Sequence, residues 1–255
     1  VDTTMAYAKG ARMGGARIVE QAEVLQILHE NGRATGVRLV HDGAEGTLRA
    51  GTVVLAAGMW SAWLARPLGV RLALQAAEHF YIVTEAMAGV PRDLPVLRVP
   101  DEWAYYKEDA GKLLLGAFEP VAKPWALDGI PHDFCFDELP NDFDHFEPVL
   151  SKAMERVPVL QSTGIATWFN GPESFTPDDR YLLGETAEVR DLFVACGFNS
   201  IGIQSSGGAG KVLAQWIHER RVPIDLPGME VRRMHPCQGT RAYLQDRTTE
   251  SLGLL

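Results

Sequence analysis

The sequence predicts an α/β (α+β) fold in which an antiparallel-sheet domain is inserted into a larger α/β domain. Two apolar strand-like segments, Thr52–Gly58 and Asp191–Cys196, and a long glycine-containing helix over Ile203–Arg220 are typical of an α/β domain. Between them, from Gly69 to about Ile165, alternating runs separated by prolines indicate a half-solvated antiparallel sheet. Because the order is α/β, antiparallel and α/β again, the middle segment is interpreted as an insertion.

The first sixty residues predict a helix followed by a small β-meander. Asp2 or Thr3 can cap a helix that runs to Gly15, and its small residues would let it lie close to a neighbouring sheet. The pairs Asn31-Gly32 and Asp42-Gly43 predict tight turns between strands. Thr52–Gly58 is apolar throughout and suits a strand buried on both faces. The meander strands are expected at Arg17–Val19, Glu23–Leu28, Ala34–Val40 and Gly46–Arg49.

Further along, the alternating runs Tyr81–Thr84 and Lys112–Phe118 predict strands of the inserted sheet. An amphipathic helix is expected over Phe143–Val157, ended by Pro158. The last thirty residues contain three prolines and are expected to form a connector that runs off the core.

Composition excludes several classes of function. The net charge of -9 argues against a nucleic-acid or anionic-membrane surface, and no run of about 18 apolar residues predicts a membrane span. Cys135, Cys196 and Cys237 are odd in number and form no CxxC pair, so we expect reduced thiols in a cytosol-like compartment and no structural zinc. The chain starts at Val1 with no initiator Met and no secretory signal, which we interpret as an internal cut.

Three blocks of sequence carry a resemblance to a known family. The first joins Gly15–Ile18 and Val24 to Thr52–Ser61, and the second joins His79–Thr84 to Trp103–Tyr106. The third and most specific block comprises Asn170–Asp178, Gly197–Ile203 and Gly207–Lys211. Together they resemble the glycine/D-amino-acid oxidase superfamily of FAD-dependent oxidoreductases, and more narrowly the dimethylglycine and sarcosine dehydrogenases.

One family feature is missing. The resemblance implies a Rossmann-like FAD domain that begins with a strand and a G-x-G-x-x-G turn, and this sequence has no such turn. The histidine through which these dehydrogenases attach FAD is missing with it. We therefore interpret the chain as a fragment with a partial FAD-binding domain over 1–68, an antiparallel substrate-binding domain over 69–165, a flavin-facing FAD-binding part over 166–222 and a connector over 223–255.

The resemblance implies the cofactor-binding residues. The turn before the long helix would direct backbone amides and a helix dipole at the flavin, whose reduced form gathers negative charge. A glycine-rich turn that only packs tightly is the alternative. Val24 would contact the adenine through its backbone; the alternative is that it is an ordinary valine of a strand. Ala57 and Gly58 would let the dinucleotide approach the chain, and Trp60 would shield it or else belong to the core. The turn residues are Asn199, Ser200, Ile201, Gly202 and Ile203.

His79 and Tyr105 are the catalytic candidates. The family places a histidine over the flavin at the position of His79, which is expected to begin a strand and can accept a proton near neutral pH. Tyr105 matches an active-site tyrosine whose hydroxyl would bind the substrate carboxylate or orient the histidine. Tyr106 would point to the opposite face of the strand. The alternative for His79 is a hydrogen-bonded core histidine. Glu173 and Asp178 could act as general acid or base groups, but the segment Ser174–Asp178 is interpreted as a turn beside the flavin, and neither residue is nominated as catalytic.

The implied function is oxidation of an N-methylated glycine, dimethylglycine or sarcosine, by hydride transfer to flavin N5. The tail Tyr243–Gly253 resembles the segment that leads into a folate-binding domain, which implies tetrahydrofolate as a further cofactor of a longer parent protein. The electron acceptor, oxygen or an electron-transfer partner, stays open. A cytoplasmic location is expected, or the mitochondrial matrix in a eukaryote. The alternatives are a catalytically silent fragment that binds a substrate or partner, and a glycine or D-amino-acid oxidase.

Overall fold

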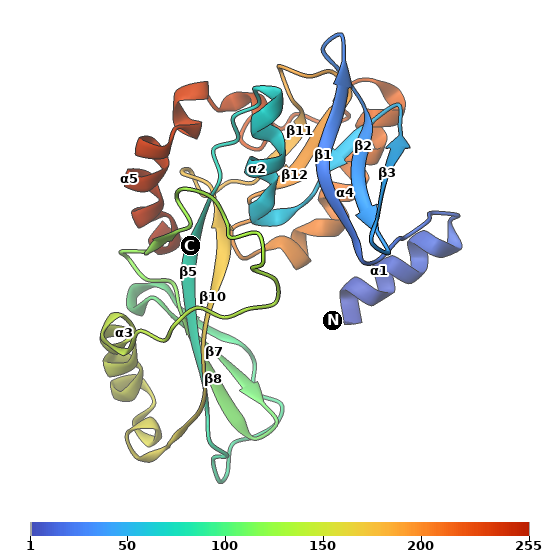
Figure 1. Cartoon of the computed structure of the whole chain (residues 1–255). Coiled ribbons are helices and arrows are strands. Elements are labelled where there is room, and N and C mark those ends of the chain that lie inside the picture. Colours follow the sequence, from blue (N-terminus) through green and yellow to red (C-terminus); the bar gives the residue numbers. More distant parts are fainter. Residues whose placement is uncertain (1, 255) are drawn as a thin grey trace. The chain divides into compact units, whose positions relative to one another are not determined.

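A computed structural model describes residues 2–254 of the chain, which divides into two compact units (Figure 1). Unit 1 comprises residues 1–73 and 180–239, and unit 2 comprises residues 74–179 and 240–255. Helices, antiparallel sheets and one parallel strand pair are all present, which confirms the predicted α/β (α+β) class. Among the described residues, no helix combines the length and apolar character needed to cross a membrane.

Unit 1 opens with a helix and a three-stranded meander. Residues Asn31, Gly32, Asp42 and Gly43 have φ of 51°, 71°, 51° and 74°, the left-handed conformation that tight hairpin turns need, so both predicted turns are confirmed. Residues 16–20, where a strand was predicted, belong to no strand. The elements are α1 (Asp2–Met13), β1 (Ala22–Glu30), β2 (Arg33–His41) and β3 (Ala44–Arg49).

Helix α1 differs from its prediction in packing. None of its described residues is buried, so its small residues do not seat it on a sheet. Its Tyr7 lies over Gly207 of α4 (Gly202–Glu219) instead, where an added Cβ would come within 2.6 Å of the Tyr7 hydroxyl. Glycine at position 207 therefore lets the two helices approach each other.

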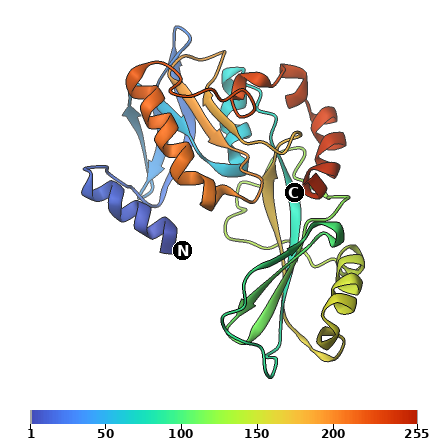
Figure 2. The same cartoon turned by 180° about the vertical axis from the view of Figure 1, so that it is seen from behind.

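The second sheet of unit 1 has the strand order β11-β12-β4. Strand β12 pairs in parallel with β4 and antiparallel with β11, and α4 lies across the sheet (Figure 2). On α4, Trp216 packs against Phe193 and over Gly184, whose φ is +112°. Strand β4 was predicted to be buried on both faces, but Val54 is 44% exposed, so this prediction was wrong. The strands are β4 (Val53–Leu55), β11 (Leu182–Glu185) and β12 (Leu192–Cys196), and the short α2 (Ser61–Ala65) follows β4.

Unit 2 is built on a long central strand, β5 (Gln75–Thr84), which lies beside β10 along most of its length (Figure 1). The sheet order is β10-β5-β8-β7-β6, and β9 also pairs with β5. All of these pairings are antiparallel, as predicted from the alternating sequence. The other strands are β6 (Leu97–Val99), β7 (Ala104–Asp109), β8 (Lys112–Ala117), β9 (Pro124–Trp125) and β10 (Ile165–Phe175).

One face of this sheet is covered by α3 (Phe143–Arg156). The helix starts where the Asp142 side chain accepts a hydrogen bond from the His145 amide at 3.0 Å, and it ends before Pro158. Phe146, Val149 and Ala153 of α3 pack against the sheet side chains that point to this face. The sheet side of this core consists of Phe80, Ile82, Ala104, Tyr106, Leu113, Leu115 and Ala117.

The end of the chain does not run off the core. Residues 241–251 form α5 (Arg241–Ser251), which lies against β5 and β9 and buries Leu244, Thr248 and Ser251. Leu252 packs with Ala77, Ala122 and Phe175 of the same unit. The expectation of a connector that runs off the core was wrong, because the sheet of unit 2 offers a surface on which Leu244 and Leu252 are buried.

Candidate functional site

The face of the unit 2 sheet opposite α3 carries the predicted catalytic residues. His79 is the fifth residue of β5, so the expectation that it begins a strand was wrong. Phe80 and Ile82 on either side of Tyr81 point into the core with α3, and alternation along the strand sends His79 and Tyr81 to the other face. His79 is only 6% exposed.

Tyr105 reaches His79 across an intervening strand. In the register of β7, β8 and β5, Gly116 pairs with both Tyr105 and Tyr81. A Cβ at position 116 would lie 1.9 Å from Tyr105 Cζ, so the tyrosine ring occupies the place of the missing side chain. Tyr105 Oη thereby lies 3.3 Å from His79 Nε2. Tyr106 is buried in the core with α3, which confirms that only one tyrosine of the pair faces the histidine.

Two further side chains complete the surroundings of His79. Glu173 on β10 places Oε2 3.7 Å from His79 Nδ1. Phe118, just after β8, presents its ring edge-on at 5.1 Å from the imidazole centroid. The Arg98 guanidinium lies 4.5 Å from the Phe118 ring. The cluster therefore brings together the His79 imidazole, the Tyr105 phenol and the Glu173 carboxylate, and the Phe118 ring lies next to both His79 and the Arg98 guanidinium.

Burial keeps the His79 imidazole and the Tyr105 hydroxyl uncharged near neutral pH. Burial lowers the pKa of His79, and the Glu173 carboxylate opposes this shift with a smaller effect. Burial also raises the pKa of Tyr105, and the charges of Glu173 and Glu119 add to the rise. A neutral imidazole beside a protonated phenol is an arrangement that can accept and pass on a proton.

In unit 1 the structure brings together two of the predicted cofactor-binding groups. Ala57, Gly58 and Trp60 follow β4, and the turn 199–203 follows β12. Because β4 and β12 are adjacent parallel strands, both groups lie at the same edge of the sheet. Ligands of α/β sheets bind at this carboxyl edge. Val24 lies on β1 in the separate meander.

The start of α4 is open to a negatively charged ligand. Asn199 and Ser200 have φ of 48° and 65°, and no side chain among the described residues caps the helix. Its first turn carries no acidic residue, so the amides there add to the positive end of the helix dipole. A cavity of about 470 Å³ lies between this turn and α1, and it is lined by Ser200, Ile201, Ile203 and Gln204 on one side and by Thr3 and Tyr7 of α1 on the other. Another of about 550 Å³ extends along the helix from Gly202 to Lys211.

Asn199 takes part in this turn in a different way from its neighbours. Its side chain is 2% exposed and donates a hydrogen bond to the Gly197 carbonyl at 2.8 Å. The amide side chain is therefore engaged in holding the turn, and the groups of the turn that border the cavity begin with Ser200.

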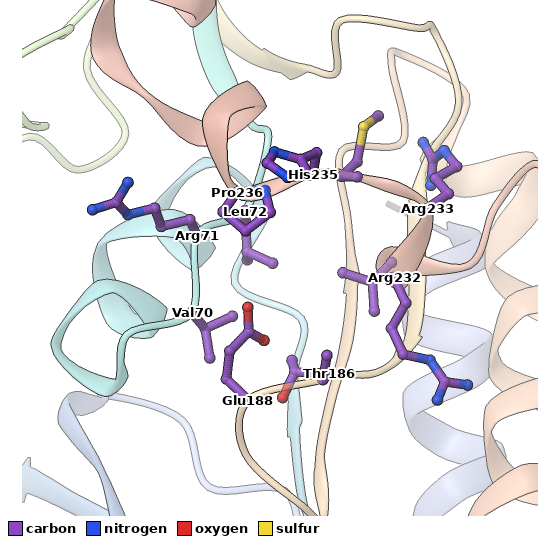
Figure 3. Close-up of a pocket in the computed structure, with 12 residues that line it drawn as sticks. Val70, Arg71, Leu72, Thr186, Glu188, Arg232, Arg233, His235 and Pro236 are labelled. Carbon is purple, nitrogen blue, oxygen red and sulfur yellow. The ribbon is translucent and has the colours of Figure 1, made fainter.

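A third cavity of unit 1, of about 310 Å³, contains none of the predicted site residues (Figure 3). Glu188 points into it between Val70 and Thr186, whereas Arg232 and Arg233 extend away (Figure 3). Arg233 donates to the Tyr181 carbonyl at 3.1 Å and Arg232 to Glu230. These arginines hold the 231–236 segment in place, so we assign the cavity no function.

Among the described residues, no three or more His, Cys, Asp or Glu side chains lie together in a way that could hold a metal ion. Cys196 is buried, and burial raises the pKa of its thiol to about 12, so it is not a reactive thiolate.

The sequence profile of the family described as FAD dependent oxidoreductase matches residues 2–216. The chain belongs to this family. The predicted resemblance is thus confirmed, and a solved structure agrees with it: glycine oxidase from Geobacillus kaustophilus superimposes with a TM-score of 0.69 at 27% identity, over 91% of this chain and 57% of that one.

Curated relatives extend the likeness over nearly the whole chain. The 4-methylaminobutanoate oxidase (formaldehyde-forming) of Paenarthrobacter nicotinovorans is 39% identical over 99% of this chain, and human mitochondrial sarcosine dehydrogenase is 37% identical over 91%. The mitochondrial pyruvate dehydrogenase phosphatase regulatory subunit of Mus musculus is 32% identical over 100%. The chain spans 30%, 25% and 29% of the length of these three proteins, respectively.

Sequence reasoning did not assign a role to Gly116, Phe118 or Arg98, and it left Glu173 out of the catalytic set. Gly116 gave one available signal, since a glycine inside an alternating strand often marks a close approach of another group. The other three carry no local signal, because their proximity to His79 depends on strand register and on the path after β8.

Proposed function

We propose that this chain provides part of an FAD-dependent oxidoreductase that oxidises an N-methylated amino acid such as sarcosine or dimethylglycine. The observation that carries the proposal is the buried His79–Tyr105 pair, in a chain of the FAD dependent oxidoreductase family. In this proposal unit 1 contacts FAD, and the predicted substrate-binding segment 69–165 supplies the proton-handling pair.

The residues at the carboxyl edge of β4 and β12 fit FAD. The uncapped first turn of α4 offers amides to a negatively charged group, and Gly58, with φ of +53°, has no atom within 4 Å of where a Cβ would stand. When bound, FAD supplies the two-electron acceptor at N5. We propose that residues 57, 58, 60 and 199–203 hold it, with Val24 contacting the adenine.

His79 and Tyr105 would control the proton of the substrate nitrogen. An ammonium must lose a proton before its nitrogen can share electrons with the carbon being oxidised. Tyr105 can take that proton while it passes its own to His79 Nε2, 3.3 Å away. Burial lowers the pKa of His79, so the imidazole is unprotonated at neutral pH and its lone pair is available to accept.

The substrate class is supported by the names of two relatives. One oxidises 4-methylaminobutanoate and one sarcosine, and both substrates carry an N-methyl group and a carboxylate. The guanidinium of Arg98, next to Phe118, is a candidate partner for the carboxylate. Glycine oxidase activity remains the competing choice within this family.

The test is anaerobic reduction of the FAD-loaded protein. We expect sarcosine, dimethylglycine or 4-methylaminobutanoate to bleach the flavin absorption, and His79→Gln and Tyr105→Phe to slow the bleaching by about 10²-fold or more. Reduction by glycine and not by any N-methyl compound would replace the proposed substrate class. Unchanged rates in both variants would remove the proposed roles of His79 and Tyr105.

A second candidate is a non-catalytic, partner-binding role, which the likeness to a phosphatase regulatory subunit favours. A protein that acquires no flavin absorption when mixed with FAD, or that holds FAD and is reduced by no amine, would support it. Tetrahydrofolate binding, an electron-transfer partner, and a cytoplasmic or mitochondrial location belong to the proposal only through the likeness to sarcosine dehydrogenase.

A further inference from the structure

We propose that Glu173 is a positioning residue that holds His79 in the tautomer protonated on Nδ1, so that the free Nε2 lone pair faces Tyr105. The proposal rests on the proposed function, in which the Nε2 lone pair of His79 accepts a proton from Tyr105. Glu173 would not touch the reacting atoms. Its role would be to decide which imidazole nitrogen can receive a proton.

Strand pairing places the carboxylate beside the ring. His79 pairs with Gly171 and Ala77 with Glu173 between β5 and β10, so Glu173 and His79 share one face of the sheet. Neither Ala77 nor Gly171 has a side chain long enough to separate them. Glu173 Oε2 and His79 Nδ1 are both buried, lie 3.7 Å apart, and have no hydrogen-bond partner among the described residues.

The chemistry of the neighbours selects one tautomer. Within residues 2–254, Tyr105 is the polar neighbour of His79 at Nε2 and Glu173 is its polar neighbour at Nδ1. A proton on Nδ1 turns a positive N–H toward the carboxylate, and Nε2 can then accept from the phenol. A proton on Nε2 would instead turn the bare Nδ1 lone pair toward a negative carboxylate in a buried place, which is repulsive. The first arrangement gives Tyr105 an acceptor and gives the Glu173 carboxylate a favourable electrostatic contact.

The side chains that face the His79 imidazole come from three neighbouring parts of the sheet. Tyr105 faces it from β7 and Glu173 from β10, while Phe118 after β8 is uncharged and separates it from Arg98. Glu173 is the charged side chain that acts on the pKa of His79, and it raises that pKa against the larger effect of burial. Removing its charge should therefore lower the pKa of His79 further.

The test is a tautomer measurement by ¹⁵N-histidine NMR on the full chain, with His79→Gln used to assign the signal. We expect the wild-type protein to show protonated Nδ1 and unprotonated Nε2. In Glu173→Gln, the side-chain amide can donate to Nδ1, so the tautomer ratio should shift on the order of tenfold toward protonated Nε2. Glu173→Asp should retain the wild-type tautomer, and Glu155→Gln on the exposed side of α3 is the charge-matched control.

Three outcomes would overturn the proposal: protonated Nε2 in the wild-type protein, an unchanged tautomer ratio in Glu173→Gln, or the same shift in Glu155→Gln. The wild-type spectrum decides the first of these even if Glu173→Gln does not fold. In the FAD-loaded protein, Glu173→Gln should also move the His79 inflection of the pH–rate profile to lower pH. A wild-type protein that shows the expected tautomer but no amine oxidation would refute the proposed function while leaving the role of Glu173 intact.

Discussion

The ring of Tyr105 lies directly over the backbone of Gly116, in the space that a side chain at position 116 would fill. This contact carries the phenol across β8 to His79. Glycine is required here for space and not for backbone conformation, because Gly116 has no left-handed φ. Four predictions follow from this and other packing and charge relationships.

Gly116→Ala should displace the Tyr105 ring, because the new Cβ would lie 1.9 Å from Cζ. The protein should lose roughly 1–3 kcal/mol of unfolding free energy, measured by urea denaturation. The raised pKa of Tyr105 should fall toward its ordinary value as the ring leaves its buried place. Gly51→Ala, with open space around the new Cβ, is the control. In a Tyr105→Ala background the substitution should cost little, and a full cost there would refute the contact.

Glu119→Gln should stabilise the protein increasingly as the pH rises. Both carboxylate oxygens of Glu119 are buried without a partner among the described residues, and burial, helped by the charge of Glu78, raises its pKa from 4.5 to about 8. The folded state then keeps a proton that the unfolded state releases, so wild-type stability falls between pH 4.5 and about 8. The gain in the variant should grow by up to about 1.4 kcal/mol per pH unit in that window.

The measurement for Glu119→Gln is urea unfolding at pH 5 and pH 8, with exposed Glu155→Gln as the matched control. Equal pH dependence in the wild-type protein and the Glu119 variant would show that this carboxyl is ionised in the folded state at neutral pH.

Gly184→Ala should destabilise unit 1 by roughly 2–4 kcal/mol. A Cβ at position 184 would come within 2.5 Å of the Trp216 ring, and the φ of +112° is strained for any residue with a side chain. Gly208→Ala in α4 meets no atom within 4 Å and should stabilise by up to about 1 kcal/mol. Chemical denaturation followed by tryptophan fluorescence measures the free energy of unfolding of both variants. Similar free energies for Gly184→Ala and Gly208→Ala would contradict the packing of Trp216 on Gly184.

Asp191→Asn should cost roughly 1–3 kcal/mol. The Asp191 side chain is 2% exposed and forms ion pairs with Arg33, at 2.7 Å, and with Arg220. Both guanidinium groups are at least half exposed, so water can compensate part of the loss. Asparagine tolerates the left-handed φ of 58° at this position, so the change isolates the charge. Thermal unfolding of Glu45→Gln, which breaks the exposed pair with Arg38, should change by less than about 1 kcal/mol.

The sequence by itself determined the features that depend on neighbours along the chain. Asn31-Gly32 and Asp42-Gly43 specify hairpin turns because they tolerate positive φ, and Pro158 ends α3 because the residue before a proline avoids helical conformation. Alternation along β7 was enough to separate Tyr105 from Tyr106. The family likeness, carried by short motifs, could also be identified in this way.

The tertiary structure alone decided which distant residues meet. Glu173 lies beside His79 because the β5–β10 register pairs Ala77 with Glu173, and Tyr105 reaches the same imidazole because Gly116 lies between them. The tail packs as α5 because a sheet surface in unit 2 is available to bury Leu244 and Leu252. The physical reason is common to all three: local patterns fix backbone conformation and side-chain direction, whereas strand register and burial are set by contacts between segments far apart in the chain.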